Sequence, residues 1–390
     1  MESGVLTDKD IKELIERNWI ISTGSINEKQ IQANTLDLTL GHKAYKLRSS
    51  FLPKKGEKIE DIISKIASYD FRLNDKEGRV LEVGITYLIE LREILKLPLK
   101  NTKIYSSTRS SIGRLDVLVR LVTDDNTMFD ETPEEFDGKM YLQVTPLSFP
   151  IRVKEGDSLN QIRFILENPL LNKEQMLSLN REQLSKGRAL LYNKYGNPII
   201  EPNFYNCGII LTADLSEGSI VYISKKNTCE IDLSKDDYYD PEDFFEIKKI
   251  TKKNAGNIIF NPGEFALVAT KEFVSIPSQE VCAEMVAIDL SIGSYRSHYA
   301  GFFDSGFGFR DKIQKEDGAQ KELILEGYMG NQATLEIRAF DVSFRMADNQ
   351  DICKLEFNYT LSEVLKPYGE KRGSNYPFQK GPKLSKFFKT

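Results

Sequence analysis

The residues with the clearest chemistry lie in the stretch TRSSIGR at residues 108–114. Arg109 and Arg114 flank the adjacent hydroxyls of Ser110 and Ser111, and a glycine precedes the second arginine. Guanidinium groups bind phosphate oxygens as a planar fork, hydroxyls add short hydrogen bonds, and glycine lets backbone amides approach closely. The stretch therefore indicates a phosphate clamp. A solvated turn between two strands is the simpler alternative for so short a motif.

A second candidate is Glu336, in the stretch TLEIRA at residues 334–339. If this stretch forms a strand, alternation places Thr334, Glu336 and Arg338 on one face. A buried glutamate with a raised pKa suits proton transfer in a hydrolytic reaction. A plain Glu–Arg pair on the protein surface is the alternative when the strand is considered alone.

Metal and histidine chemistry are disfavoured because suitable side chains are scarce. The only histidines are His42 and His298, and the four cysteines are scattered without CxxC spacing. A zinc site normally needs a His/Cys cluster, and a Ser-His-Asp triad needs a histidine placed for it. The acidic runs at 124–137 and 238–245 lack the regular oxygen spacing of an EF-hand, so we expect solvated loops there.

Length and composition limit the class of protein. The chain of 390 residues is longer than one hydrophobic core usually serves, so we expect two domains. A net charge of −5 offers no general attraction to nucleic acid or to an anionic membrane. No apolar run reaches the ~18–20 residues of a membrane span, and the first residues, MESGVLTDKD, lack a signal-peptide pattern. These features and the scattered cysteines favour a cytoplasmic protein.

The candidate residues must be positioned by a mostly-β chain with a few short helices. Short β-branched and aromatic runs are separated by Gly, Asn and Asp turns along most of the sequence. Helical spacing appears in residues 7–20, where Thr7 and Asp10 form a capping-box pattern, and again in residues 57–70. Residues 172–190 read as a polar helix that connects two halves.

The two halves resemble each other in sequence. Residues 79–98 match residues 258–277 in the order strand, glycine, strand, charged pair and closing proline. Residues 139–164 match residues 332–357 in order and length. A period of roughly 180–190 residues indicates duplicated domains, because solenoid repeats are only ~20–50 residues long.

These repeats divide the chain into four parts. We expect an N-terminal domain with the clamp at residues 1–170 and a helical connection at 171–205. A second domain with Glu336 follows at 206–365, and a tail at 366–390 ends the chain.

The copies differ at the positions that could do chemistry. The second copy has Ile288, Asp289, Leu290 and Ile292 in the region of the clamp, so its basic character is lost. Conversely, the first copy has Gln143 where the second has the candidate glutamate. One copy keeps an anion clamp and the other a carboxylate, which suggests one site assembled from both halves.

Several separated motifs together resemble the dCTP deaminases. They are the clamp stretch RSSIGRL, the hairpin HYAGFFDSGF at 298–307, the strand ATLEIRA and the tail YGEKRGSNYPFQKG at 368–381. The entry segment QIQANTLDLTLG at 30–41 and the closing GPKLSKFF at 381–388 agree as well. These enzymes are metal-free members of the trimeric dUTPase superfamily, and the long, duplicated bacterial form is the most similar. The resemblance implies two tandem dUTPase-like β-barrel or jelly-roll domains.

The resemblance implies roles for the clamp and the carboxylate. The family's Arg-Ser-Ser-x-x-Arg element falls on Arg109, Ser110, Ser111 and Arg114. Ser110 and Arg114 are then expected to orient the attacking water and the cytosine, while their neighbours hold phosphate. Glu336 falls on the position of the catalytic glutamate.

The hairpin and the tail are implied to complete the site. The hairpin that carries base and sugar falls on His298 to Asp304, and the Ala300 carbonyl is expected to help hold the water. The family's position for His298 requires no imidazole, so we reject it as a general base. In the tail, Tyr368 and Gln379 are the residues implied to close over the nucleotide.

Two departures from the family pattern affect this assignment. Asn375 stands where a lysine is expected just ahead of Tyr376, a further substrate-binding candidate, which weakens the expected triphosphate contacts. Ser305 stands where a proline is usual, which predicts a less rigid hairpin.

The implied reaction is hydrolytic deamination of dCTP to dUTP and ammonia, without a cofactor held by the protein. Mg²⁺ is expected to arrive with the triphosphate. A dUTP pyrophosphatase, or a bifunctional enzyme that also releases pyrophosphate, is the first alternative, and a non-catalytic nucleotide-binding regulator is the second. Simple family members are trimers with sites between subunits, but a duplicated chain can supply both sides of a site itself. The sequence leaves the oligomeric state open.

Overall fold

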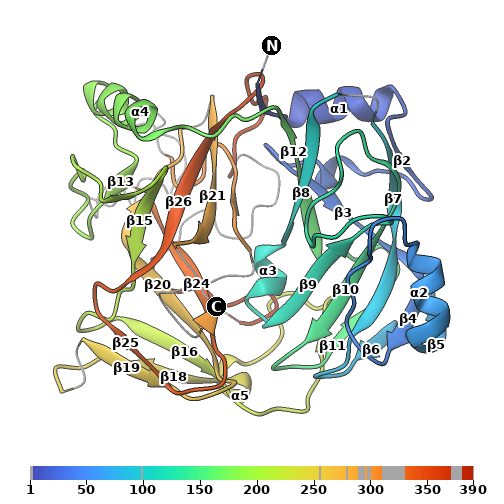
Figure 1. Ribbon diagram of the computed structural model, residues 1–390. Helices are drawn as coiled ribbons and strands as arrows, with labels where there is room; N and C mark the ends of the chain where they lie inside the picture. The colour runs from blue at the N-terminus through green and yellow to red at the C-terminus, as the bar shows by residue number, and fades with distance from the viewer. Residues whose placement is uncertain are drawn as a thin grey trace. The chain divides into compact units, whose positions relative to one another are not determined.

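The computed structural model describes residues 3–97, 100–253, 256–277, 280–288, 295–296, 300–309, 330–369 and 380–389. The chain forms two compact units, each built mainly of β-strands, which confirms the expected fold class (Figure 1). Unit 1 holds Met1–Asn168, Lys225–Phe244 and Leu384–Thr390, and unit 2 holds Pro169–Ser224 and Phe245–Lys383. Among the described residues, no helix is both long and apolar enough to cross a membrane.

The described residues of unit 1 form three β-sheets and several short helices. Its helices are α1 (Asp8–Glu16), η1 (Glu28–Gln30), α2 (Ile59–Ile66), α3 (Ser110–Gly113) and α5 (Pro241–Phe244). Its strands are β1 (Gly4–Val5), β2 (Ile20–Ser22), β3 (Leu36–Leu38), β4 (Leu40–Leu47), β5 (Ala67–Arg72), β6 (Arg79–Leu81), β7 (Tyr87–Lys96), β8 (Thr102–Thr108), β9 (Val117–Val122), β10 (Asp137–Pro146), β11 (Ile151–Val153), β12 (Asn160–Leu166) and β17 (Ile231–Asp232).

Unit 2 begins with α4 (Lys173–Ser185) and continues as strands. They are β13 (Leu191–Tyr192), β14 (Phe204–Tyr205), β15 (Gly208–Thr212), β16 (Ile220–Ser224), β18 (Phe245–Lys249), β19 (Asn257–Phe260), β20 (Phe265–Val274), β21 (Val281–Ala287), β22 (Tyr295–Arg296), β23 (Phe302–Phe303), β24 (Asn331–Ala339), β25 (Phe344–Ala347) and β26 (Asp351–Tyr359).

The two units share one strand order, which confirms the duplication. One sheet runs β5-β4-β7-β10-β9 in unit 1 and β18-β16-β20-β24-β22 in unit 2. β12 lies between β3 and β8, just as β26 lies between β15 and β21. The antiparallel pair β6–β11 corresponds to β19–β25.

A duplicated glutamate is buried in unit 1 and half-buried in unit 2. The Glu93 carboxylate accepts hydrogen bonds from the backbone nitrogen of Thr39 (2.8 Å) and its hydroxyl (2.7 Å). The Glu272 carboxylate accepts the same two bonds from Thr212, both at 2.8 Å. Burial raises the pKa of both carboxyl groups above the ordinary value for glutamate. The repeat therefore preserves a structural link between corresponding strands.

The cation beside each glutamate is preserved too. Arg92 pairs with Glu155 at 2.9 Å, and Lys271 pairs with Asp348 at 2.5 Å. The acidic partners lie in corresponding turns, before β12 and before β26. The adjacent charged residues in the sequence repeat, Arg92–Glu93 and Lys271–Glu272, therefore connect neighbouring strands and turns in both units.

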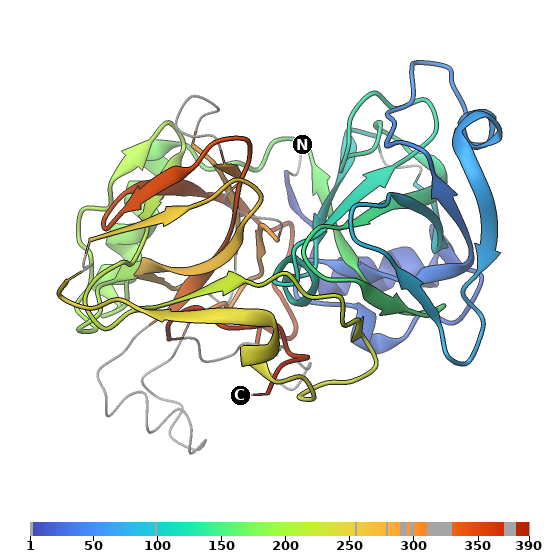
Figure 2. The same cartoon turned by 90° about the horizontal axis from the view of Figure 1, so that it is seen from below.

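Two segments from late in the sequence belong to unit 1. β17, within residues 225–244, adds to β11 as a parallel strand. Figure 2 shows the C-terminal end of the chain beside α5. Residues 384–389 pack there, and the rings of Phe244 and Phe388 lie 5.4 Å apart. Clustering of contacts thus assigns residues 225–244, from within the expected second domain at 206–365, and the end of the expected tail at 366–390 to unit 1. Phe244 is also buried, so the run at 238–245 is not simply the solvated loop expected from its acidity.

The helices expected from local patterns are confirmed. The capping box at Thr7 and Asp10 precedes α1, where each side chain bonds the backbone of the other. α2 lies within residues 57–70, and α4 lies within residues 172–190 and ends before the expected boundary.

Candidate active site

The clamp residues lie on and beside α3, a four-residue helix between β8 and β9. Arg109 is the N-cap of this helix and Arg114 is its C-cap. Ser111 and Arg114 are buried, with exposures of 2% and 5%, whereas Ser110 is half-buried. A solvated turn is therefore wrong for this stretch. The structure gathers the four predicted clamp residues on one helical turn of unit 1.

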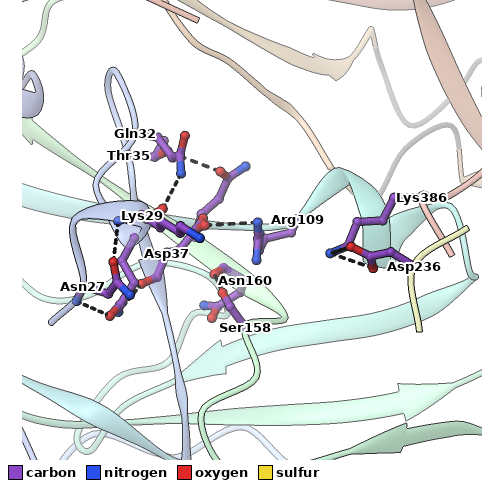
Figure 3. A network of polar contacts seen from close by, with 12 residues as sticks. Asn27, Lys29, Gln32, Thr35, Asp37, Arg109, Ser158, Asn160, Asp236 and Lys386 are labelled. Carbon is purple, nitrogen blue, oxygen red and sulfur yellow. Dashed lines mark hydrogen bonds and ion pairs between the residues drawn. The ribbon is translucent and has the colours of Figure 1, made fainter. Parts of the chain in front are cut away.

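Arg109 is held by an aspartate that sequence reasoning missed. Its Nη2 lies 3.2 Å from Oδ2 of Asp37, whose side chain on β3 is 5% exposed (Figure 3). In unit 2 both partners are replaced by apolar residues. Ile210 lies at the matching point of β15, and Ile288 takes the place of Arg109. The joint loss of both charges supports the conclusion that only the first copy keeps the clamp.

Glu336 lies at the centre of β24, with 2% of its surface exposed. Its neighbours Leu335 and Ile337 enter the hydrophobic core of unit 2, so alternation turns the glutamate to the opposite face. Its Oε2 accepts a hydrogen bond of 3.0 Å from the backbone nitrogen of Ala300. The structure thus brings together two predicted site residues. The alternative of a plain surface Glu–Arg pair is wrong, because the carboxylate is buried.

The same face of β24 also binds the segment that leads to the C-terminus. Gln332 accepts a hydrogen bond from the backbone nitrogen of Gly381 at 2.6 Å. Thr334 accepts one from the backbone nitrogen of Lys383 at 3.2 Å. Polar side chains at alternate positions of one strand therefore bind two separate stretches of backbone, the hairpin and the C-terminal segment. Sequence reasoning placed Thr334 on this face but did not identify what it binds.

The hairpin at 300–309 is fixed by hydrogen bonds and ring contacts. The hydroxyl of Ser305 donates to the carbonyl of Val281 at 2.6 Å, and the backbone nitrogen of Tyr368 donates to the Ser305 carbonyl at 2.8 Å. The rings of Tyr368 and Phe307 lie 5.4 Å apart. Ser305 therefore forms a side-chain bond that a proline at this position could not form, and the rigidity of the hairpin stays a prediction. Asp304, in the same hairpin, is buried at 8% exposure.

The remaining predicted residues divide into two groups. His298, Tyr376 and Gln379 lie outside the described residues. Tyr368 packs against the hairpin, and its contact with a nucleotide stays a prediction. The clamp residues are placed in unit 1, while Ala300, Asp304 and Glu336 are placed in unit 2.

The acidic run at 124–137 has a structural use. Asp124 accepts a hydrogen bond from the backbone nitrogen of Ile59 at 2.8 Å, and Asp130 accepts one from that of Leu121 at 2.8 Å. These carboxylates organise neighbouring backbone, which differs from the solvated loop expected there. Within the described ranges, no group of three or more His, Cys, Asp and Glu side chains is arranged to hold a metal ion.

Comparison with known proteins decides the family. The profile of the 2'-deoxycytidine 5'-triphosphate deaminase N-terminal domain matches residues 2–168, and that of the C-terminal domain matches residues 179–388. The chain belongs to the dCTP deaminase family. A crystal structure of 2'-deoxycytidine 5'-triphosphate deaminase from Agrobacterium tumefaciens is similar over 92% of this chain and 100% of its own, with a TM-score of 0.80 and 32% identity.

Shorter relatives match one half of the chain. The dCTP deaminase of Ignicoccus hospitalis is 26% identical over 168 residues, which is 43% of this chain and 86% of the relative. The dUMP-forming dCTP deaminase of Dictyoglomus turgidum is 29% identical over 178 residues, which is 45% of this chain and 78% of the relative. Relatives of about half the length agree with a duplicated dCTP deaminase.

Proposed function

We propose that this chain is a dCTP deaminase that hydrolyses the 4-amino group of dCTP and releases dUTP and ammonia. The observation that carries the mechanism is the burial of Glu336 on β24 with the Ala300 nitrogen 3.0 Å from its carboxylate. Family membership supplies the reaction class. A carboxylate held in this way has its orientation fixed by the backbone, which suits proton transfer to a bound substrate.

Glu336 is proposed to move the protons of the reaction. It accepts a proton from water as the water oxygen attacks C4 of cytosine, and it delivers that proton to N3 to give a tetrahedral adduct. The second proton of the former water then goes to the amino group, again through Glu336. The C4–N4 bond breaks, ammonia leaves and the uracil carbonyl forms. One water is consumed for each ammonia, so the step balances.

The clamp is proposed to act on the same nucleotide. Arg109 and Ser111 bind phosphate oxygens, while Ser110 and Arg114 orient the water and stabilise charge on the adduct. The ion pair with Asp37 fixes the direction of the Arg109 guanidinium before substrate binds. Mg²⁺ is proposed to enter with the triphosphate.

Product analysis tests this function directly. The purified protein is incubated with dCTP, CTP, dCMP and dUTP, and the nucleotides, ammonia and pyrophosphate are resolved. Conversion of dCTP to dUTP with one ammonia supports the proposal. Absence of turnover with tight dCTP binding contradicts it and favours a non-catalytic regulator.

A bifunctional reaction is the second candidate. The Dictyoglomus turgidum relative and one from Methanosphaera stadtmanae are both named dUMP-forming dCTP deaminases. If this chain shares that activity, dCTP yields dUMP, ammonia and pyrophosphate, and added dUTP is hydrolysed as well. The incubation described above distinguishes the two reactions by the pyrophosphate.

Catalysis is proposed to need no zinc. We expect activity to survive exhaustive removal of zinc, with no loss beyond what Mg²⁺ restores. Stoichiometric zinc that is lost in step with activity contradicts this proposal.

A further inference from the structure

The C-terminal arm, defined as residues 384–389, is packed into unit 1. Ser385, Phe387 and Phe388 have exposures of only 2%, 2% and 1%. The ring of Phe388 lies 5.4 Å from that of Phe244, which in turn lies 5.4 Å from that of Phe149 in the body of unit 1. Burial of two phenylalanines close to the chain end fixes a segment that is otherwise free to fray.

Backbone hydrogen bonds fix the arm along its length. The carbonyl of Phe387 accepts bonds from the backbone nitrogens of Tyr238 and Tyr239, at 2.9 and 3.0 Å. The backbone nitrogen of Lys389 donates to the carbonyl of Tyr239 at 2.9 Å. The side chains of Lys386 and Asp236 add an ion pair of 3.0 Å, seen with Arg109 in Figure 3. The arm therefore has a defined position relative to the rest of unit 1.

One bond joins this arm to the clamp. The hydroxyl of Ser385 donates to the backbone carbonyl of Ser111 at 2.6 Å, and the bond is buried. Ser111 lies within α3, where the carbonyls of the other three residues accept bonds from the backbone nitrogens of Arg114, Leu115 and Asp116. Ser385 supplies the hydrogen-bond partner for the Ser111 carbonyl at the centre of this turn.

We propose that Ser385 is a positioning residue that holds the phosphate clamp in its working geometry. Arg109 at the start of α3 is fixed by Asp37, and Ser385 fixes the middle of the helix. Loss of the hydroxyl leaves a buried carbonyl without its partner and lets the turn shift. Displacement of binding groups by about 1 Å is enough to reduce catalysis strongly. This inference rests on the proposed function of the clamp.

The test compares Ser385→Ala with Ser385→Thr and two controls. Ser385→Ala is expected to raise the KM for dCTP and to lower kcat/KM about tenfold, equivalent to one buried hydrogen bond at about 1.4 kcal/mol. Ser385→Thr keeps the hydroxyl and is expected to restore most of the activity. Ser219→Ala removes a similar bond in unit 2, from a serine hydroxyl to the carbonyl of Ser216 at 2.7 Å, and Lys386→Ala removes the exposed ion pair of the arm. Both controls are expected to leave KM unchanged.

Hydrogen exchange separates positioning from stability and from the reaction itself. In Ser385→Ala, the amides of residues 110–114 are expected to exchange faster, while those of unit 2 do not change. This readout does not require turnover, so it remains decisive if the wild-type protein fails to deaminate dCTP. Unchanged exchange at α3 overturns the proposal, as does a loss of activity that only follows the loss of folded protein at constant KM.

Discussion

Gln143 holds the backbone of Phe51 through both ends of its side-chain amide. Its Nε2 donates to the Phe51 carbonyl at 2.6 Å, and its Oε1 accepts from the Phe51 nitrogen at 3.4 Å and from the Ser50 hydroxyl at 2.7 Å. Strand register makes Gln143 the counterpart of Glu336. Gln143 lies opposite Leu88 of β7, and Glu336 lies opposite Leu267, the corresponding residue of β20. In the first copy, this position therefore binds the protein's own chain.

A neighbouring aspartate binds the same segment of unit 1. Asp124 follows β9, the strand whose Arg120 pairs with Gln143 in the ladder. Asp124 accepts a hydrogen bond from the first residue of α2. The counterpart of Glu336 and a nearby aspartate thus bind residues 50–59 in unit 1.

We therefore expect one tight nucleotide site per chain. Titration with a non-hydrolysable dCTP analogue measures this number. Gln143→Ala is expected to retain activity within about twofold and to lower the free energy of unfolding by roughly 1–3 kcal/mol, because the backbone of Phe51 loses its partners. Two equal tight sites per chain contradict this expectation, as does a Gln143→Ala protein without activity.

Glu336→Gln is expected to abolish deamination while dCTP binding is largely kept. The amide retains the shape and can still accept the Ala300 bond, but it cannot carry a proton. Loss of a proton shuttle lowers the rate by on the order of 10²–10⁴, and by more if the water also loses its orientation. Single-turnover kinetics and analogue binding measure the two effects separately. Glu356→Gln, which alters a Lys–Glu pair on β26, is the matched control, and substantial turnover by Glu336→Gln contradicts the assignment.

Sequence patterns predicted the features that are set by residues close to one another in the chain. The capping box at Thr7 and Asp10 is set within one helical turn, and the alternation around Glu336 is set within one strand. The duplication was also visible, because two copies repeat the same order of strands, glycines and charges. Alternation placed Glu336 on the face opposite Leu335 and Ile337, but the strand alone did not show that this face is buried too.

Partners distant in the sequence could not be predicted in the same way. Asp37 meets Arg109 because β12 pairs with both β3 and β8, and nothing in either segment specifies that arrangement. Ser385 and Ser111 are separated by 274 positions, and their contact depends on the return of the arm to unit 1. The sequence showed that Gln143 replaces the glutamate of the second copy, but it did not show that Gln143 binds the backbone of Phe51. Local rules fix the elements, whereas tertiary packing selects these pairs.

Buried Glu93 and half-buried Glu272 are expected to make stability depend on pH. Burial raises the pKa of each carboxyl, so the folded state keeps its proton at pH values where the unfolded chain has lost it. The free energy of unfolding therefore falls as pH rises from the ordinary value of 4.5 through the raised pKa, by at most about 1.36 kcal/mol per pH unit for each group. Urea unfolding at several pH values measures this decline.

Glu93→Gln and Glu272→Gln should each flatten the decline. An amide does not titrate, so one carboxyl's share of the slope disappears even where the variant is less stable at every pH. Glu217→Gln changes an exposed side chain and serves as the control. Unchanged slopes in both glutamine variants would show that these carboxyl groups titrate normally in the folded protein.

Arg114→Ala is expected to remove catalysis and to weaken binding of the dCTP analogue by roughly 1.5–3 kcal/mol, the strength of a hydrogen bond to a charged group. The guanidinium is buried at the C-cap of α3, so its loss also leaves space beside the helix. Arg48→Ala removes an exposed arginine of unit 1 that bonds a backbone carbonyl, and it serves as the control. Calorimetry measures binding, and the rate is measured at saturating dCTP. Full activity in Arg114→Ala contradicts a role for the clamp in the reaction.

Mixed assemblies test whether one chain supplies both the clamp and the carboxylate. Arg114→Ala and Glu336→Gln chains are co-expressed with different tags and purified through both tags. If the clamp and the carboxylate of one chain act on the same nucleotide, every site in the mixed assembly carries one defect and the assembly is inactive. Recovery of activity would instead assign the clamp of one chain to the carboxylate of another. Assemblies of wild-type and Glu336→Gln chains, purified in the same way, provide the reference for half-active protein.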